Sequence, residues 1–368
     1  MLTKGAVLYG IKNDLIVGSL ELEDPRAGEV LIKMEAASIC HSDLHVISGQ
    51  AKQELPCILG HEGAGTVVAL GEGVSTVSLG DHVVLSWLPF CGKCYQCKRG
   101  RTHLCRAHEA AIWGGTLLDG SCRFKNSYGD IRQLGTIGCW AEHVVVPQEC
   151  CVSINKLVPF RVAALLGCAV TTGVGAVLNR AKVESGDTVA IIGMGGVGLS
   201  VLMGAKLQRA SKIICIDVNT SVKDLAVSLG CTDFIALDNH MEILHKIRNL
   251  TKVGTDHVFE AVGKRKLQRR AIDYCCPGGQ VTFVGLDGSD ASIILPTTDI
   301  TRTEKMITGS IYGSVCTNRD FVFYAEKYLD GTLPIDLIIE RSYSITQINE
   351  GINDMLSGKP GRGIITFN

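Results

Sequence analysis

Four cysteines in one short segment form the densest group of metal-ligating residues in this chain of 368 residues. They are Cys91, Cys94, Cys97 and Cys105. Thiolates at this spacing can reach one Zn²⁺ ion at ~2.3 Å in a tetrahedron, and a set of four cysteines leaves no open position for a substrate. The segment therefore predicts a structural zinc site, with an iron–sulfur cluster or free thiols as the alternatives.

A glycine-rich segment has the pattern expected of a dinucleotide site. Gly193, Gly195 and Gly198 form G-x-G-x-x-G between an apolar, strand-like run and a helical pattern. Such glycines permit a tight turn, let the backbone approach a pyrophosphate and let helix and strand pack closely, while the helix N-terminus favours the phosphate charge. Asp217 ends the next strand about 20 residues later, where it would accept ribose hydroxyls and repel a 2′-phosphate. The pattern predicts NAD rather than NADP, and a purely structural glycine turn is the alternative.

Three more segments carry possible metal ligands outside the four-cysteine segment. They are Cys40–His45, the pair His61–Glu62, and the stretch that begins at Cys168. Taken singly, a buried cysteine is usually a small apolar residue, and a lone histidine is usually only hydrogen-bonded. These segments indicate a metal site only when they are considered together and in their order along the chain.

In that order, the motifs resemble those of the zinc-containing medium-chain alcohol dehydrogenases. The matching motifs are C-H-S-D-L-H from Cys40, G-H-E-G-A-G from Gly60, the four-cysteine segment, G-C-x-x-T-T-G from Gly167, G-x-G-G-V-G from Gly193 and the final G-R-G from Gly361. The resemblance implies a catalytic zinc bound by Cys40, His61 and Cys168, with its fourth position left for water or the substrate oxygen.

The resemblance also implies roles for residues beside the catalytic zinc. Ser42 and His45 match a proton relay that runs through the nicotinamide ribose, although a capping serine and a surface histidine are the alternative interpretation. Asp43 matches the carboxylate that orients His61, and Glu62 matches the acid behind the zinc. The site is thus expected to bind the alcohol oxygen and to remove its proton.

Further cofactor contacts are expected from residues spread along the chain. They are His41, Thr172, Gly196, Val197, Val262, Val284 and Arg362. Arg362 matches an arginine that reaches the cofactor phosphates, and Thr172 matches a residue near the nicotinamide. Many family members have a lysine where this chain has Val222, so the role of Lys223, one position later, stays open.

The elements that must position these residues form two regions. Short strand signals separated by turns continue to about Val146, and helical stretches alternate with buried strands from near Val162, as in a parallel sheet. By resemblance, the expected fold is α/β. It comprises a GroES-like, partly open β-barrel catalytic domain with the zinc lobe (residues 1–169 and 313–368) and a doubly wound Rossmann domain (residues 170–312).

Composition excludes several classes of protein. The residues are 46% hydrophobic and 20% charged, and the net charge is −1, which fits a globular chain without the basic surplus of a nucleic-acid binder. No apolar run approaches the ~20 residues of a membrane span, and the N-terminus lacks a signal-peptide core. We therefore expect a cytoplasmic protein with a small-molecule substrate and neither a nucleic-acid nor a membrane partner. Without an export signal, the 16 cysteines indicate metal binding or catalysis rather than disulfides.

The implied activity is the reversible NAD-linked oxidation of a primary or secondary alcohol. Its pocket would be lined by Leu44, Trp87, Trp113, Trp140, Val284 and Leu286. A dehydrogenase of thiol adducts of formaldehyde is the alternative within the family, although that branch has an arginine where this chain has Glu109. Two rival functions are a zinc-free quinone or enoyl reductase of the same fold and a silent nucleotide-binding protein. The resemblance further implies a homodimer, with a homotetramer as the alternative.

Overall fold

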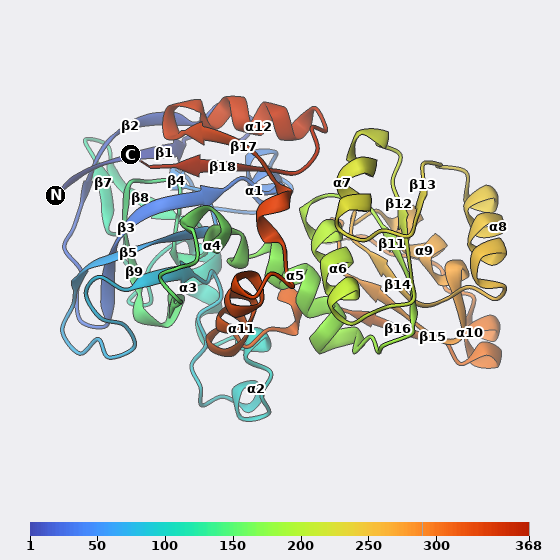
Figure 1. Cartoon of the computed structure of the whole chain (residues 1–368). Helices are drawn as coiled ribbons and strands as arrows, with labels where there is room; N and C mark the ends of the chain where they lie inside the picture. The colour runs from blue at the N-terminus through green and yellow to red at the C-terminus, as the bar shows by residue number, and fades with distance from the viewer. Residues whose placement is uncertain (289, 368) are drawn as a thin grey trace. The chain divides into compact units, whose positions relative to one another are not determined.

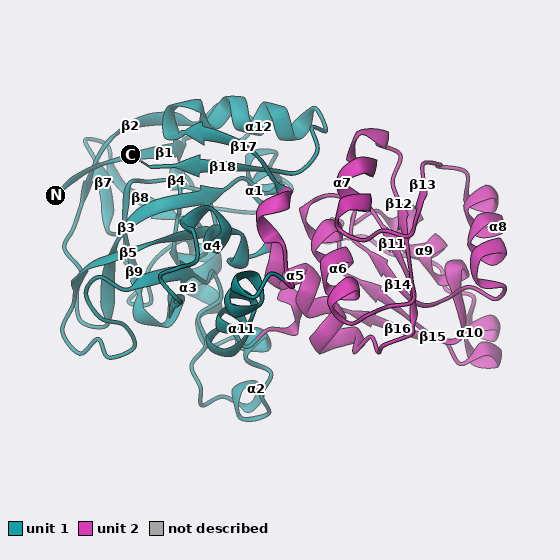
Figure 2. Ribbon diagram, in the orientation of Figure 1, with its two compact units in different colours: residues 1–168, 316–331, 339–368 teal, residues 169–315, 332–338 magenta. Residues whose placement is uncertain are grey.

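The computed structural model describes residues 1–288 and 290–367, which divide into two compact units. Unit 1 comprises Met1–Cys168, Cys316–Gly331 and Ile339–Asn368, and unit 2 comprises Ala169–Val315 and Thr332–Ile338 (Figure 2). The chain therefore leaves unit 1 directly after Cys168 and returns to it for its final strands.

Unit 1 is a β-structure with helices at its periphery (Figure 1). Among the described residues, one set of strands closes a barrel in the order β1-β2-β7-β8-β4. Its strands are β1 (Leu2–Leu8), β2 (Ile16–Leu22), β4 (Cys57–Ile58), β7 (Phe124–Asn126) and β8 (Gly129–Gln133). The second set is an open sheet, so the predicted partly open barrel is observed as a closed barrel beside a sheet.

This open sheet has the order β10-β6-β5-β3-β18-β17, and β9 also pairs with β3. Its strands are β3 (Glu29–Ser38), β5 (Gly63–Leu70), β6 (His82–Leu85), β9 (His143–Pro147), β10 (Cys151–Ser153), β17 (Ile339–Ser344) and β18 (Arg362–Thr366). The helices of unit 1 are α1 (His41–Ile47), α2 (Tyr95–Lys98), α3 (Glu109–Gly114), α4 (Phe160–Leu166), α11 (Thr317–Leu329) and α12 (Ile348–Leu356). Strand β3 is central because it pairs antiparallel with β5, β9 and β18.

One expectation about the region before β9 is wrong. The segment from Arg106 to Cys139 contains α3 and the barrel strands β7 and β8. Trp140 was expected to line the substrate pocket, but its side chain is fully buried in the apolar core of unit 1. Its indole N–H donates to the carbonyl oxygen of Ser38 at 3.2 Å, so the polar atom of this large ring is satisfied inside the core.

Unit 2 contains a six-stranded parallel sheet of order β13-β12-β11-β14-β15-β16. In chain order this is 3-2-1-4-5-6, the Rossmann arrangement, so the predicted fold class is confirmed. The strands are β11 (Thr188–Ile192), β12 (Lys212–Ile216), β13 (Asp233–Ile235), β14 (Thr255–Glu260), β15 (Cys275–Phe283) and β16 (Met306–Gly309). Their apolar side chains are buried because helices cover both faces of the sheet.

The helices of unit 2 are α5 (Ala169–Gly175), which continues as a π-helix over Ala176–Ala181, α6 (Gly196–Leu207), α7 (Lys223–Ser228), α8 (His240–Thr251), α9 (Arg265–Tyr274) and α10 (Thr297–Thr303). Helices α6 and α7 flank one side of the sheet, and α8 and α9 flank the other (Figure 1). In the described part of the chain, no single helix is long and apolar enough to cross a membrane; only the bent pair Phe160–Leu166 and Ala169–Ala181, taken together, reaches that length and apolarity.

Candidate metal and cofactor sites

The four sulfur atoms of the predicted structural zinc site converge in a lobe around α2, which projects from unit 1 (Figure 2). All four lie within 4.8 Å of one another, and Cys105 Sγ is 3.7 Å from Cys91 Sγ and 3.9 Å from Cys94 Sγ. Thiolates at ~2.3 Å from one ion and at tetrahedral corners are ~3.8 Å apart. The sulfur spacing therefore fits a tetrahedral zinc ion, whereas a disulfide would require ~2.05 Å.

The environment of this lobe also favours a metal. Helix α2 buries none of its residues, so an ion has to supply the cohesion that apolar packing supplies elsewhere. The backbone amide of Lys93 lowers the pKa of the Cys91 thiol to about 6. That thiol therefore loses its proton readily, as a zinc ligand must.

A second group of ligands is organised by Asp43, which lies on α1 and is fully buried. Its Oδ1 atom accepts from His61 Nδ1 at 3.0 Å and from the backbone N–H of Gly60 at 3.1 Å. Its Oδ2 atom accepts from the backbone N–H of Cys40 at 3.2 Å. One carboxylate thus links the two segments that carry Cys40 and His61, and it holds Nδ1 of His61, which leaves Nε2 as the ring atom that can face a metal.

Cys40, His61 and Cys168 meet inside unit 1. The Cys168 thiol lies close to both Cys40 and His61, and its contact with Cys40 is the main reason that the pKa of Cys40 lies well below that of a free thiol. His61 Nε2 is buried, and no N–H or O–H group of a described residue donates to it. An imidazole nitrogen beside two thiols is a donor set that zinc prefers, so these residues fit the implied metal.

Behind this group lies a buried ion pair between Glu62 and Arg362. The Glu62 carboxylate also lies within 4.8 Å of the ligand atoms of Cys40 and His61. Burial raises the pKa of Glu62 to about 7, against the opposing effect of the Arg362 charge. Arg362 donates in addition to Ser38 Oγ at 2.8 Å. Arg362, expected at the cofactor phosphates, is thus held here by Glu62 and Ser38.

Ser38 is a site residue that the sequence analysis missed. It lies at the end of β3, and its side-chain oxygen accepts from both Nε and Nη2 of Arg362. No motif marks a serine at this position; the only signal in the sequence is that it precedes Cys40 by two residues.

The residues of the expected proton relay lie on α1. Ser42 Oγ is 3.9 Å from Cys40 Sγ, so the hydroxyl group lies beside the candidate metal ligands. His45 follows three positions later, which places it on the same helix face as Ser42. Desolvation lowers the pKa of His41, the first residue of α1.

The glycine-rich turn of unit 2 joins β11 to α6 and has the geometry of a phosphate cradle. Gly193 has φ +92°, which favours glycine, and a side chain on Gly198 would lie 1.8 Å from the carbonyl oxygen of Gly193. A side chain on Gly195 would meet no atom within 4 Å, so its side of the turn is open. Asp217 lies beside this turn because its carboxylate accepts from the N–H groups of Met194 at 2.6 Å and Asn219 at 2.8 Å. The turn and its carboxylate fit a dinucleotide.

The other expected cofactor residues of unit 2 are distributed around this turn and the sheet. Gly196 and Val197 begin α6, Val262 follows β14 and is 39% exposed, and Thr172 lies within α5. Val284 and Leu286 line a pocket of about 430 Å³ at the carboxyl ends of β15 and β16, the end of a parallel sheet where ligands bind.

The residues near the position of the expected lysine have different surroundings. Val222 is 3% exposed and belongs to the core, whereas Lys223, the first residue of α7, is exposed. Only Lys223 can therefore offer a charge to a ligand from this position.

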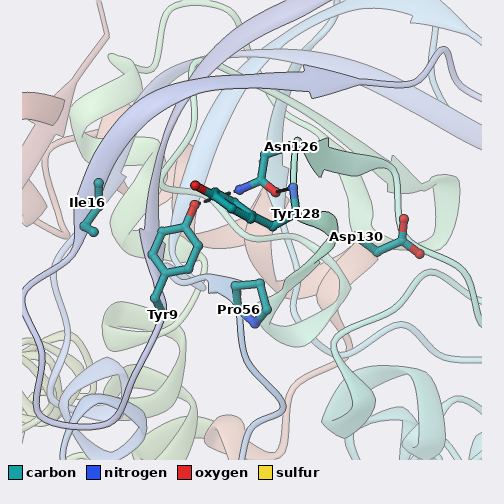
Figure 3. A pocket seen from close by; sticks show the side chains of 6 residues that line it. All are labelled: Tyr9, Ile16, Pro56, Asn126, Tyr128 and Asp130. Atoms are coloured by element: carbon teal, nitrogen blue, oxygen red, sulfur yellow. Dashed lines mark hydrogen bonds between the residues drawn. The ribbon is translucent and has the colours of Figure 1, made fainter.

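The barrel rim carries a pocket of about 480 Å³ that contains none of the predicted site residues (Figure 3). Tyr9, Ile16, Pro56, Asn126, Tyr128 and Asp130 line it. Asn126 Nδ2 donates to the hydroxyl oxygen of Tyr9 at 2.9 Å, as the dashed line in Figure 3 shows. This pocket brings no metal ligand or glycine turn together, so it is not the candidate active site.

Comparison with known proteins gives matches along nearly the whole chain. The family model "Alcohol dehydrogenase GroES-like domain" matches residues 26–156, and "Zinc-binding dehydrogenase" matches residues 196–325. The S-(hydroxymethyl)glutathione dehydrogenase of Saccharomyces cerevisiae is 38% identical over 96% of this chain and 93% of its own length. The alcohol dehydrogenase class-3 of Dictyostelium discoideum is 35% identical over 99% of this chain and 97% of its own length.

Solved structures of alcohol dehydrogenases also match the whole chain. The benzyl alcohol dehydrogenase of Acinetobacter calcoaceticus superposes with a TM-score of 0.94 at 28% identity, covering 100% of both chains. An alcohol dehydrogenase zinc-binding domain protein from Burkholderia ambifaria superposes with a TM-score of 0.95 at 29% identity, covering 100% of this chain and 99% of its own.

Proposed function

This chain belongs to the zinc-containing medium-chain alcohol dehydrogenase family, and on that premise we propose that it oxidises the hydroxymethyl adduct of a small thiol with NAD. The four-cysteine lobe is its structural zinc site. The proximity of Cys40, Cys168 and the buried His61 imidazole carries the proposal of a second, catalytic zinc. The names of several relatives, S-(hydroxymethyl)glutathione dehydrogenase, support the substrate class.

When bound, zinc would acidify the substrate hydroxyl and NAD would accept a hydride. The protein groups hold and orient these partners: Cys40, His61 and Cys168 would bind the metal, Asp43 aligns His61, and Asp217 would bind the ribose hydroxyls. Ser42 accepts the hydroxyl proton and His45 releases it to solvent. The balanced reaction converts R–S–CH₂OH and NAD⁺ into the formyl thioester R–S–CHO, NADH and one proton.

A simple aromatic or aliphatic alcohol is the second candidate substrate, and two observations favour it. Glu109 occupies the position where the thiol-adduct branch has an arginine, although Arg106 lies 3.9 Å from its carboxylate. The rings of Trp87 and Trp113 lie 6.4 Å apart and offer an apolar surface. The lining of unit 1 is therefore also compatible with an aromatic alcohol.

The test compares NADH formation from formaldehyde with glutathione, from formaldehyde alone, and from benzyl alcohol. We expect turnover with formaldehyde only in the presence of the thiol, and Ser42→Ala should reduce kcat ~10²- to 10⁴-fold without loss of zinc. Ser48→Ala, at the other end of α1, is the matched control and should retain activity. If benzyl alcohol is turned over faster than the mixture of formaldehyde and glutathione, the simple alcohol is the better substrate assignment. If no hydroxyl compound is turned over, the proposal is refuted.

A further inference from the structure

Glu260, the last residue of β14, carries a buried carboxyl group that the proposed mechanism does not use. Its Oε1 atom accepts from the backbone N–H groups of Val262 at 3.0 Å and Gly263 at 2.9 Å, and its Oε2 atom accepts from that of Gly263 at 3.2 Å. A buried carboxyl group is costly unless it is hydrogen-bonded, and here the bonds go to the turn that follows the strand. The side chain of Glu260 therefore ties residues 261–263 to the end of β14.

This turn lies directly against the glycine-rich turn of unit 2. A side chain on Gly193 would lie 2.3 Å from Val262 Cγ2, so the side chain of Val262 contacts this glycine. The backbone N–H of Ala261 donates to the carbonyl oxygen of Ile192 at 2.9 Å, which joins the turn to the end of β11. A displacement of residues 261–263 would therefore move the partly exposed side chain of Val262 relative to the dinucleotide turn.

On its other side, the turn contacts the segment that follows β15. The N–H groups of Val284 and Gly285 both donate to the backbone carbonyl oxygen of Glu260 at 2.9 Å. A side chain on Gly285 would lie 2.1 Å from the backbone nitrogen of Gly263, and one on Gly263 would lie 2.2 Å from the carbonyl oxygen of Leu286. The carboxyl group of Glu260 thus acts on a turn that is packed between the ends of β11 and β15, where the expected cofactor residues lie.

We propose that Glu260 is a positioning residue for the dinucleotide, because its carboxyl group holds residues 261–263 in the conformation that forms one wall of the cofactor site. This inference rests on the proposed use of NAD. Glu260 itself is buried and acts through Val262, which lies against Gly193. If a turn without this acceptor adopts the binding conformation only one tenth of the time, the apparent Kd for NADH rises about tenfold. The KM for NAD should rise with kcat nearly unchanged, because binding is weakened and the reacting groups are not altered.

Titration of the zinc-loaded protein with NADH, followed by the fluorescence of the nucleotide, measures this effect. Glu260→Ala removes the acceptor and should raise the Kd for NADH about tenfold or more. Glu260→Gln should bind NADH nearly as well as the parent, because the single Oε1 atom accepts from both N–H groups and an amide oxygen can replace it. Glu260→Asp keeps the charge but is one methylene shorter, so it should weaken binding and takes the place of the alanine variant if that variant does not fold.

Asp256→Ala is the matched control. Asp256 lies near the other end of β14, and its Oδ2 atom accepts from the backbone N–H and the hydroxyl group of Thr188 at 2.8 Å and 2.7 Å. This variant therefore also loses a carboxylate that accepts from a backbone N–H on the same strand. Denaturant unfolding should show a loss of stability in both variants, whereas the affinity for NADH should fall only when Glu260 is replaced.

Three results would overturn the proposal. They are an unchanged Kd for NADH in Glu260→Ala, an equal rise in Asp256→Ala, and a rise in Glu260→Gln as large as that in the alanine variant. A parent protein that binds no NADH would refute the use of NAD and this inference with it. A parent protein that binds NADH but oxidises no hydroxyl compound would refute only the proposed reaction, and the comparison of the variants would still decide the role of Glu260.

Discussion

Replacement of Asp43 by asparagine tests the organisation of the candidate catalytic zinc site. The amide oxygen can still accept from His61 and Gly60, but the amide NH₂ group would face the N–H of Cys40, where Oδ2 accepts at 3.2 Å. An unpaired buried donor costs ~1–3 kcal/mol. Loss of the carboxylate behind a ligating histidine independently costs ~10- to 100-fold in metal affinity, or ~1.4–2.7 kcal/mol. The unpaired donor and the lost carboxylate are thus each expected to cost a free energy of the same size, ~1–3 kcal/mol.

We therefore expect Asp43→Asn to lower the affinity of one zinc ion by ~10- to 100-fold and to leave the four-cysteine ion in place. Competition with a chelator of known zinc affinity measures both ions in one titration. Asp81→Asn is the matched control, because Asp81 also accepts from a backbone N–H, that of Ser78 at 3.0 Å, but far from any ligand. An affinity within about twofold of the parent, or loss of both ions together with the secondary structure, would refute the reasoning.

Three further predictions concern other parts of the molecule. Cys97→Ser should remove one zinc per chain, measured by metal analysis, and should open the α2 lobe to proteases, since α2 buries none of its residues; retention of both ions would contradict this. Asp217→Gly should shift kcat/KM toward NADP by about tenfold or more, since a hydrogen bond to a charged group is lost and the repulsion of the 2′-phosphate is removed; an unchanged ratio would mean that another residue contacts the ribose. Burial raises the pKa of Glu260 to about 7, so the Glu260 carboxyl group binds its proton more tightly in the folded chain than in the unfolded chain. Its contribution to stability is therefore present below about pH 4 and is lost as the pH rises through about 7, by up to about 3 kcal/mol. Denaturant unfolding of the parent and of Glu260→Gln at pH values across this range should diverge by that amount, and parallel curves would exclude it.

The sequence predicted those parts of the fold that depend on local pattern. The apolar runs at Thr188–Ile192 and Lys212–Ile216 are adjacent parallel strands, because a buried parallel strand needs apolar residues on both faces. The fold of Arg106–Cys139 was not predictable in this way. Strands β7 and β8 are only a few residues long and carry polar residues such as Lys125 and Asp130. Their pairing is set by barrel closure rather than by periodicity.

The residues of the candidate site also divide into those that local sequence predicts and those that it does not. Cys40 and His61 belong to motifs, and their position beside Asp43 follows from short segments that one carboxylate links. Ser38 belongs to no motif, because its role arises only when Arg362, 324 residues later, folds back against β3. Long-range partners of this kind carry no signal in local sequence.

The return of the chain to unit 1 has a consequence for the order in which the protein assembles during synthesis. Ala169–Val315 leaves the ribosome as a nearly continuous unit, whereas the edge of β3 at Ala36–Ser38 has no partner until β18 emerges. Until then the Glu62 carboxylate also lacks its guanidinium partner. A nascent chain that is complete except for its last strand therefore presents an unsatisfied strand edge and an uncompensated acid, and chaperones that bind such edges should engage this protein late in translation.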